Sequence, residues 1–138
     1  EVLLYSQPHP SREAWCRARV ALTKERLEGL SEGEELVLIN HYPLRHDLVR
    51  LFRIPRFSPW CGTKLTEDWH TRFRAKVVVS GHLHVRATDW RDGVRFEEVS
   101  LGYPRHWNQA KGIDAYLREI LPGPSQVPAG NSGPHWHR

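Results

Sequence analysis

The sequence has no methionine, only two cysteines and no long apolar segment. No apolar run approaches the roughly 20 residues needed to span a bilayer, and no secretory segment opens the chain, so we predict no membrane association. Cys16 and Cys61 stand alone, without a C-x-x-C partner, which favours reduced thiols and a cytoplasmic location. Because the chain lacks methionine and opens on Glu1, we expect a fragment or a processed product.

Lysine is also scarce, so the net charge of +4 at pH 7 comes mainly from arginine. Arginine suits bidentate contact with phosphate and carboxylate groups, which permits a phosphorylated or acidic partner. The same charge permits nucleic acid without favouring it. With 138 residues, the chain has the length of one small domain with a modest core.

Two apolar segments each deliver histidine at their C-terminal end. Val77–Ser80 is a buried-type strand that runs into Gly81-His82-Leu83-His84, and Leu36–Ile39 is a similar strand that runs into Asn40-His41-Tyr42-Pro43. In an extended backbone His82 and His84 would point the same way, so both imidazoles could serve one small volume. Since chemistry in open α/β sheets collects beyond the carboxyl ends of the strands, we expect the two ends to share a site.

The remaining pattern predicts an α/β fold. Helices are expected at residues 11–30, with Ser11 as N-cap, and at residues 67–74, with Thr66 as N-cap. The second helix separates the two strands, which suits a parallel pair. Asp92-Gly93 predicts a hairpin between residues 85–91 and 94–100, and a last helix is expected over residues 113–121.

The blocks N-H-x-P at Asn40–Pro43 and G-H-x-H at Gly81–His84 resemble the last two signature blocks of the calcineurin-like metallophosphoesterases. This resemblance implies that residues 1–121 are the C-terminal half of a four-layer α/β/β/α sandwich. Residues 122–138 are rich in proline, glycine, serine and asparagine, which predicts a disordered tail. The resemblance also implies two metal ions, Mn, Fe or Zn, whose bound hydroxide attacks phosphorus. By position, His41 and His82 would bind one metal and His84 the other.

The earlier blocks of that family, D-x-H, G-D-x-x-D and G-N-H-[DE], are absent from this sequence. In the family they supply the remaining ligands, including the carboxylate that bridges the metals. The resemblance therefore implies a missing N-terminal half, and we predict that the chain alone is inactive.

Two further stretches, W-C-G-T at residues 60–63 and residues 89–105, resemble actinobacterial metallophosphoesterases. This resemblance implies a phosphodiesterase that acts on phosphopantetheinylated carrier protein, an acidic partner that would suit the arginines. Arg45 and His46 are the candidate substrate-binding residues, because they lie only a few residues beyond His41. A cluster at residues 103–107 either approaches the metal pocket or packs on the sheet.

Two alternatives remain open from the sequence. Three histidines with a water molecule suffice for catalytic zinc, so His41, His82 and His84 could form a mononuclear zinc hydrolase. The chain could also be a truncated, non-catalytic half-domain.

Overall fold

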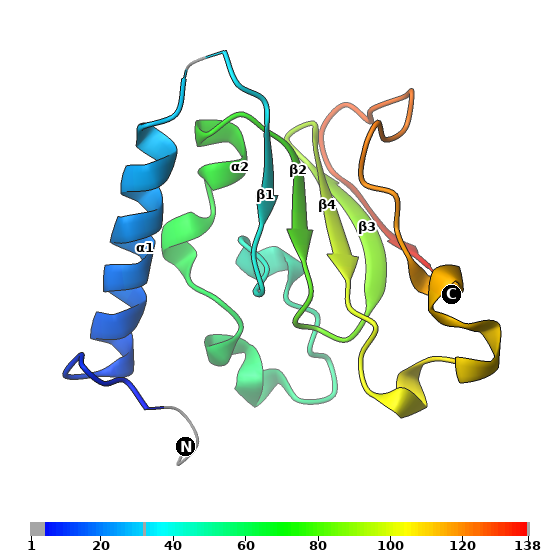
Figure 1. Ribbon diagram of the computed structural model, residues 1–138, viewed down its shortest axis with the longest axis horizontal. Helices are drawn as coiled ribbons and strands as arrows, with labels where there is room; N and C mark the ends of the chain where they lie inside the picture. Colours follow the sequence, from blue (N-terminus) through cyan, green and yellow to red (C-terminus); the bar gives the residue numbers. More distant parts are fainter. Residues whose placement is uncertain (1–4, 32, 138) are drawn as a thin grey trace. The chain divides into compact units, whose positions relative to one another are not determined.

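The computed structural model describes residues 5–31 and 33–137, and the chain divides into two compact units, residues 1–34 and 35–138 (Figure 1). The first unit contains helix α1, Arg12–Glu28. Ser11 is its N-cap, in extended backbone, and accepts a hydrogen bond of 3.1 Å from the amide of Ala14. The helix predicted for residues 11–30 is therefore confirmed, as is its capping residue.

The second unit is built on one five-stranded sheet with the order β1-β2-β4-β3-β5. Its strands are β1 Leu36–Ile39, β2 Ala75–Ser80, β3 Arg86–Arg91, β4 Val94–Val99 and β5 Ser132–Trp136. Figure 1 shows β1, β2 and β4 running in the same direction, and the pairs β1–β2 and β2–β4 are parallel. The register of β1 against β2 has an irregularity between Leu36 and Val37. The predicted parallel pair is confirmed, and the class of the fold is α/β.

The hairpin of β3 and β4 turns at Asp92 and Gly93, as predicted. Both residues have positive φ, 55° and 77°, which is the backbone conformation that a two-residue hairpin turn of this kind requires. Since β4 lies between β2 and β3, the hairpin extends the sheet directly beside the strand that carries the G-H-x-H block.

The sheet is buried by apolar side chains and by helix α2, Trp69–Arg72. Val77 and Val78 are almost fully buried, and the ring of His70 packs on Phe96 of β4 with centroids 5.2 Å apart. The helix is shorter than the predicted residues 67–74. Thr66 is not its N-cap, because the Thr66 hydroxyl donates instead to the carbonyls of Leu44 and Thr63.

The other helical segments are short 3-10 turns, at His46–Leu48, Pro55–Trp60, Lys64–Thr66, Pro104–His106, Gln109–Lys111 and Ile113–Tyr116. The helix predicted over residues 113–121 is therefore wrong beyond Tyr116. Leu117, the C-cap of the 3-10 turn Ile113–Tyr116, already has an extended backbone. Arg118 then donates to the buried carboxylate of Glu97, which holds the chain along the sheet. None of the helices in residues 5–31 and 33–137 has the length and apolar character needed to cross a membrane.

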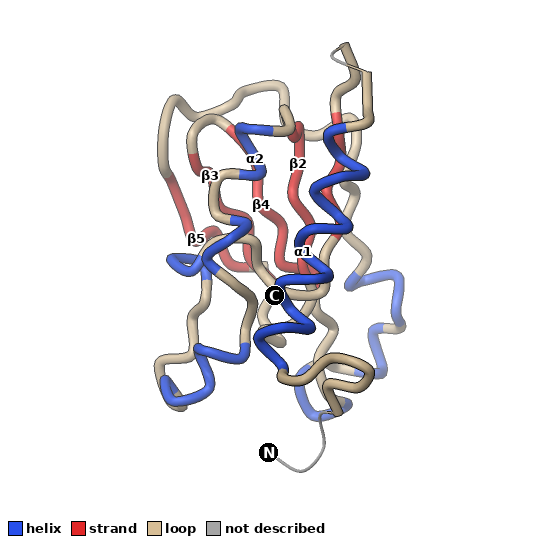
Figure 2. Tube along the Cα trace, turned by 90° about the vertical axis from the view of Figure 1, so that its left-hand side faces the viewer, coloured by secondary structure: helices blue, strands red, loops and turns tan. Residues whose placement is uncertain are grey.

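Strand β5 corrects the expectation of a disordered tail at residues 122–138. In Figure 2 it lies beside β3, and the pairing is antiparallel, with Ala87 opposite Trp136 and Thr88 opposite His135. The amide of His137 also donates to the carbonyl of Arg86 at 2.9 Å. Proline and glycine are unfavourable in strand interiors but are accepted on an edge strand, which is where β5 lies. The proline-rich and glycine-rich composition of residues 122–138 did not indicate this pairing.

Gly133 is required for β5 to approach β3 so closely. Its φ is +104°, and a Cβ there would lie 2.7 Å from Oδ1 of Asp89 and 2.8 Å from the carbonyl of Thr88. Gly133→Ala is expected to release β5 and to lower the free energy of unfolding by about 3 kcal/mol, because the cost of the overlap adds to the roughly 1–2 kcal/mol of positive φ alone. Gly130→Ala is the matched control, because Gly130 also has positive φ but meets nothing within 4 Å. Urea unfolding measures both, and equal losses would contradict the prediction.

Candidate functional site

The carboxyl ends of β1 and β2 lie side by side, and the backbone itself joins them. The amide of Asn40 donates to the carbonyl of Val79 at 2.9 Å, which continues the parallel ladder past the end of β1. One step further, the amide of Gly81 donates to the carbonyl of His41 at 3.2 Å. The two histidine-bearing turns are therefore held together by main-chain hydrogen bonds.

The imidazoles of His41 and His82 meet at this place. Nδ1 of His82 lies 3.0 Å from Nε2 of His41, and the ring centroids are 4.9 Å apart. Tyr42 packs against both rings, with centroids 4.8 Å from His41 and 4.6 Å from His82. The expectation that histidines from two strand ends share one location is confirmed for this pair.

The environment of His82 disfavours its protonated form. Burial lowers the pKa of His82, and the neighbouring His41 and His84 lower it further, because each disfavours an additional positive charge. A neutral imidazole is the form that binds metal ions.

His84 does not join the pair, which corrects the expectation of a common volume for His82 and His84. The backbone has already left β2, and His84 has φ of 56°, so the alternation of side chains along an extended strand does not apply. The ring of His84 packs instead against Tyr103, with centroids 4.5 Å apart, and against His106 at 5.6 Å. His41 and His84 therefore face different neighbours.

The His41–His82 pair fits two ligands of a single metal ion. The two nitrogens lie 3.0 Å apart, within hydrogen-bond distance of each other, and nitrogens bound at about 2.1 Å to one ion also lie roughly 3 Å apart when the angle at the ion is near 90°. Within residues 5–31 and 33–137, however, no three His, Cys, Asp or Glu side chains come close enough together to hold an ion. In the part of the chain that the structure describes, His41, His82 and His84 therefore do not gather into one three-ligand group.

The two candidate substrate-binding residues lie in the segment after β1. Arg45 and His46 line a cavity of about 470 Å³ together with residues 43, 49, 55, 58, 59 and 61–64. His46 is exposed, whereas the guanidinium of Arg45 donates to Asp47 at 2.8 Å and lies 3.5 Å from a carboxylate oxygen of Asp92. Arg45 is therefore directed toward the β3–β4 turn.

A chain of ion pairs ties this segment to the hairpin. Asp47 also accepts a hydrogen bond of 2.6 Å from Arg91, and burial, which raises its pKa, is outweighed by the hydrogen bonds from Arg91 and Arg45, which lower it. Arg50 forms a bidentate pair with Asp89 at 2.7 and 2.5 Å, with both side chains buried. These contacts fix the course of the chain beyond His41.

Several residues near the histidines escaped the sequence analysis as site residues. Tyr103 and His106, from the cluster at residues 103–107, contact His84. Trp107 instead packs on Tyr116, with centroids 5.5 Å apart. Glu98 of β4 binds the backbone of the G-H-x-H turn. The aromatic and basic composition of residues 103–107 could have identified them as site residues. Glu98 lies in an ordinary strand pattern, which does not indicate a site.

Comparison with known proteins gives two related matches. The chain is 51% identical over 128 residues, 93% of its length, to the [acyl-carrier-protein] phosphodiesterase PptH of Mycobacterium tuberculosis. The crystal structure of phosphopantetheinyl hydrolase (PptH) from the same organism superposes with a TM-score of 0.80 at 49% sequence identity, covering 91% of this chain and 44% of that one. No family model matches the sequence. The chain is thus a homologue of the mycobacterial protein, and it spans 39% of that protein's length.

Proposed function

We propose that this chain forms part of the active site of a metal-dependent phosphodiesterase that acts on phosphopantetheinylated carrier protein. The observation that carries the proposal is the pair of imidazole nitrogens, His41 Nε2 and His82 Nδ1, brought to 3.0 Å from two separate strand ends. The homology supports the substrate, because the mycobacterial relative is an acyl-carrier-protein phosphodiesterase.

In this proposal the histidines divide between two metal ions. His41 and His82 would hold one ion, and His84, whose ring lies apart from the pair beside Tyr103, would contribute to the other. Imidazole with carboxylate suits manganese, iron or zinc. When bound, such ions provide an activated water at neutral pH and offset the charge of the phosphate oxygens. The chain's own residues place the imidazoles: the Gly81 amide holds the two turns together, and Tyr42 limits the movement of both rings.

The remaining ligands would come from residues outside this sequence. The proposal places residues 1–121 in the C-terminal half of a four-layer α/β/β/α sandwich, with an N-terminal half that carries the blocks D-x-H, G-D-x-x-D and G-N-H-[DE]. Two observations support it: the relative is much longer than this chain, and the described residues contain no group of three metal-binding side chains. Without the carboxylates of the other half, the charge of two metal ions would be poorly compensated, so the chain alone is proposed to be inactive.

The acidic carrier protein is proposed to contact the arginine-rich segment after His41. The cavity lined by Arg45, His46 and Lys64 lies just beyond the N-H-x-P block; His46 and Lys64 would suit the phosphate of the substrate or acids on the carrier directly, whereas Arg45 would first have to leave Asp47. With such a partner, the protein is proposed to act in the cytoplasm.

Mass spectrometry of holo carrier protein tests the function. We expect a longer protein that contains this chain and the three missing blocks to release the phosphopantetheine arm when Mn²⁺ or Fe²⁺ is present, and to leave the carrier mass unchanged in EDTA. The 138-residue chain alone is expected to leave the mass unchanged under both conditions. An unchanged mass with the longer protein and either metal would refute the substrate, and turnover of p-nitrophenyl phosphate by the short chain would refute its inactivity.

A second candidate function is that of a non-catalytic half-domain. The observation that favours it is again the incomplete ligand set of the described residues. This alternative predicts that His82→Ala leaves release of the arm by the longer protein unchanged, and loss of that activity in His82→Ala would exclude it.

A further inference from the structure

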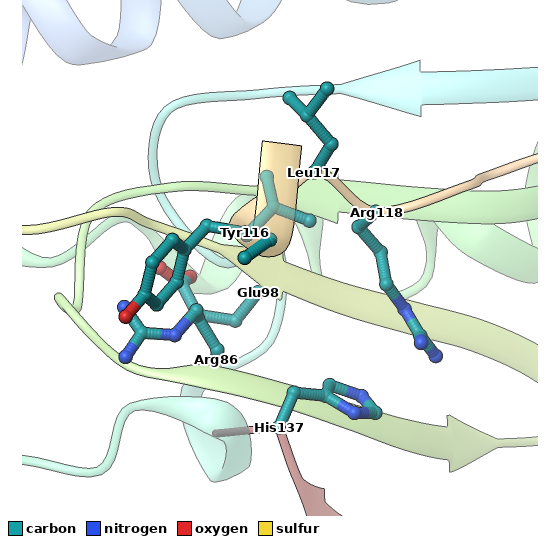
Figure 3. Close-up of a pocket in the computed structure, with 8 residues that line it drawn as sticks. Arg86, Glu98, Tyr116, Leu117, Arg118 and His137 are labelled. Atoms are coloured by element: carbon teal, nitrogen blue, oxygen red, sulfur yellow. The ribbon is translucent and has the colours of Figure 1, made fainter. Parts of the chain in front are cut away.

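Glu98 is a buried carboxylate directly behind the G-H-x-H turn. It belongs to β4, pairs in register with Ser80 of β2, and is only 8% exposed. Figure 3 shows it in the wall of a cavity of about 160 Å³, beside Arg86 and Tyr116. Burying a carboxylate is costly unless its oxygens accept hydrogen bonds, so the contacts of Glu98 indicate what it does.

Glu98 accepts hydrogen bonds from the G-H-x-H turn and from two serines beside it. Oε1 accepts from the amide of Leu83 at 3.1 Å and from the hydroxyl of Ser100 at 2.5 Å. Oε2 accepts from the hydroxyl of Ser80 at 2.8 Å. The same Ser100 hydroxyl also lies close to the carbonyl of Gly81, and because it carries one hydrogen it donates to one of these two acceptors at a time. Glu98 thus contacts this stretch directly at Ser80 and Leu83, and Ser100 links it to Gly81.

The amide of Leu83 lies between the two histidines in the sequence, so this hydrogen bond restrains the backbone from which both side chains extend. His84 has positive φ, a conformation that non-glycine residues adopt at a cost and keep only where the surroundings hold them. A carboxylate can accept from several donors at once, which a single amide oxygen does less completely. The choice of glutamate at position 98 therefore matches the number of donors in the turn.

We propose that Glu98 is a positioning residue for the metal-binding histidines, acting through the backbone of Leu83 and the hydroxyls of Ser80 and Ser100. The metal part of this inference rests on the proposed function. Groups that orient metal ligands commonly contribute about 10-fold to 100-fold to metal affinity.

Glu97 offers a matched control. It is the next residue of the same strand, it is 1% exposed, and alternation places it on the opposite face of the sheet. Its carboxylate accepts from Thr88 and Arg118 and makes no recorded contact with the turn. Glu97→Gln therefore perturbs an equally buried acid without touching residues 80–84.

The test uses the 138-residue chain with two readouts, the hydrogen-exchange rate of the Leu83 amide by NMR and the binding of Co²⁺ by calorimetry and visible absorption. For Glu98→Ala we expect exchange at Leu83 to rise about tenfold. We also expect Co²⁺ affinity to fall about tenfold with an altered absorption spectrum. Glu98→Gln is expected to restore both in part, and Glu97→Gln to change neither.

Each result decides a separate point. Unchanged exchange at Leu83 in Glu98→Ala, or an equal change in Glu97→Gln, overturns the positioning role. Faster exchange with unchanged Co²⁺ affinity overturns its importance for the metal. If the unsubstituted chain binds no Co²⁺, the affinity measurement is made in a longer protein that also carries the three missing blocks; absence of Co²⁺ binding there overturns the metal assignment of the proposed function, while exchange at Leu83 still tests the role of Glu98 in the turn. If Glu98→Ala does not fold, Ser100→Ala removes one contact of the same carboxylate and is expected to raise Leu83 exchange about threefold; no rise overturns the proposal.

Discussion

His82→Ala is expected to lower the Co²⁺ affinity of the 138-residue chain by about 100-fold or more, since even residues that only support a ligand contribute up to about that factor. The reason is geometric. His82 supplies one of the two nitrogens that lie 3.0 Å apart, and alanine leaves His41 as a single ligand at that place. Titration calorimetry measures the affinity, and circular dichroism confirms that the variant folds.

His135→Ala is the matched control, because His135 is an exposed histidine on β5, away from the turn. It is expected to leave Co²⁺ affinity unchanged. If His41 and His82 hold the same ion, the variant that lacks both should bind little worse than either single variant, because the first substitution already removes the paired site. Fully additive losses would show instead that the two imidazoles bind independently.

Asp89→Ala is expected to lower the free energy of unfolding by about 3–5 kcal/mol, the loss typical of a broken buried ion pair. The side chains of Asp89 and Arg50 are 4% and 9% exposed, and two hydrogen bonds join them. Removing the carboxylate leaves the guanidinium of Arg50 buried without its partner. Urea unfolding monitored by tryptophan fluorescence measures the loss.

The double variant Arg50→Met/Asp89→Leu separates the cost of burying an unpaired charge from the net stabilisation that the ion pair provides. It is expected to be more stable than Asp89→Ala, because apolar residues of similar volume often replace a buried ion pair at little cost. Glu35→Ala is the control: its partner Lys76 forms an exposed pair, so the loss should stay below about 1 kcal/mol. A similarly small loss for Asp89→Ala would contradict the role assigned to burial.

The local parts of the fold could be predicted from the sequence because their signals are local. The runs of β-branched residues marked β1 and β2, and Asp92-Gly93 marked the hairpin. Strand β5 could not be predicted, since its pairing depends on the free edge of β3, more than 40 residues away in the chain for the pair Thr88 and His135. The proline and glycine in the segment favoured disorder on composition alone.

The candidate site, too, could be predicted from the sequence only in part. Two strand ends that each deliver a histidine predicted the meeting of His41 and His82, because parallel neighbours end at the same edge. The turn of His84 toward Tyr103 depends on backbone dihedral angles after the strand ends, for which the H-x-H spacing holds no information. Glu98 was missed because its partners are backbone and hydroxyl groups that no sequence motif identifies.

The register of β1 against β2 also determines where this part of the chain tolerates insertions and deletions. Residues Val37 to Ile39 pair continuously with Val77 to Val79, and the ladder runs on to His41. One added residue within that stretch would move His41 along the strand and reverse the direction of its side chain. An added residue before Val37 falls at the existing irregularity, where extra length can be accommodated as a bulge. Length variation among homologous sequences should therefore collect upstream of Val37 and be absent between Val37 and His41.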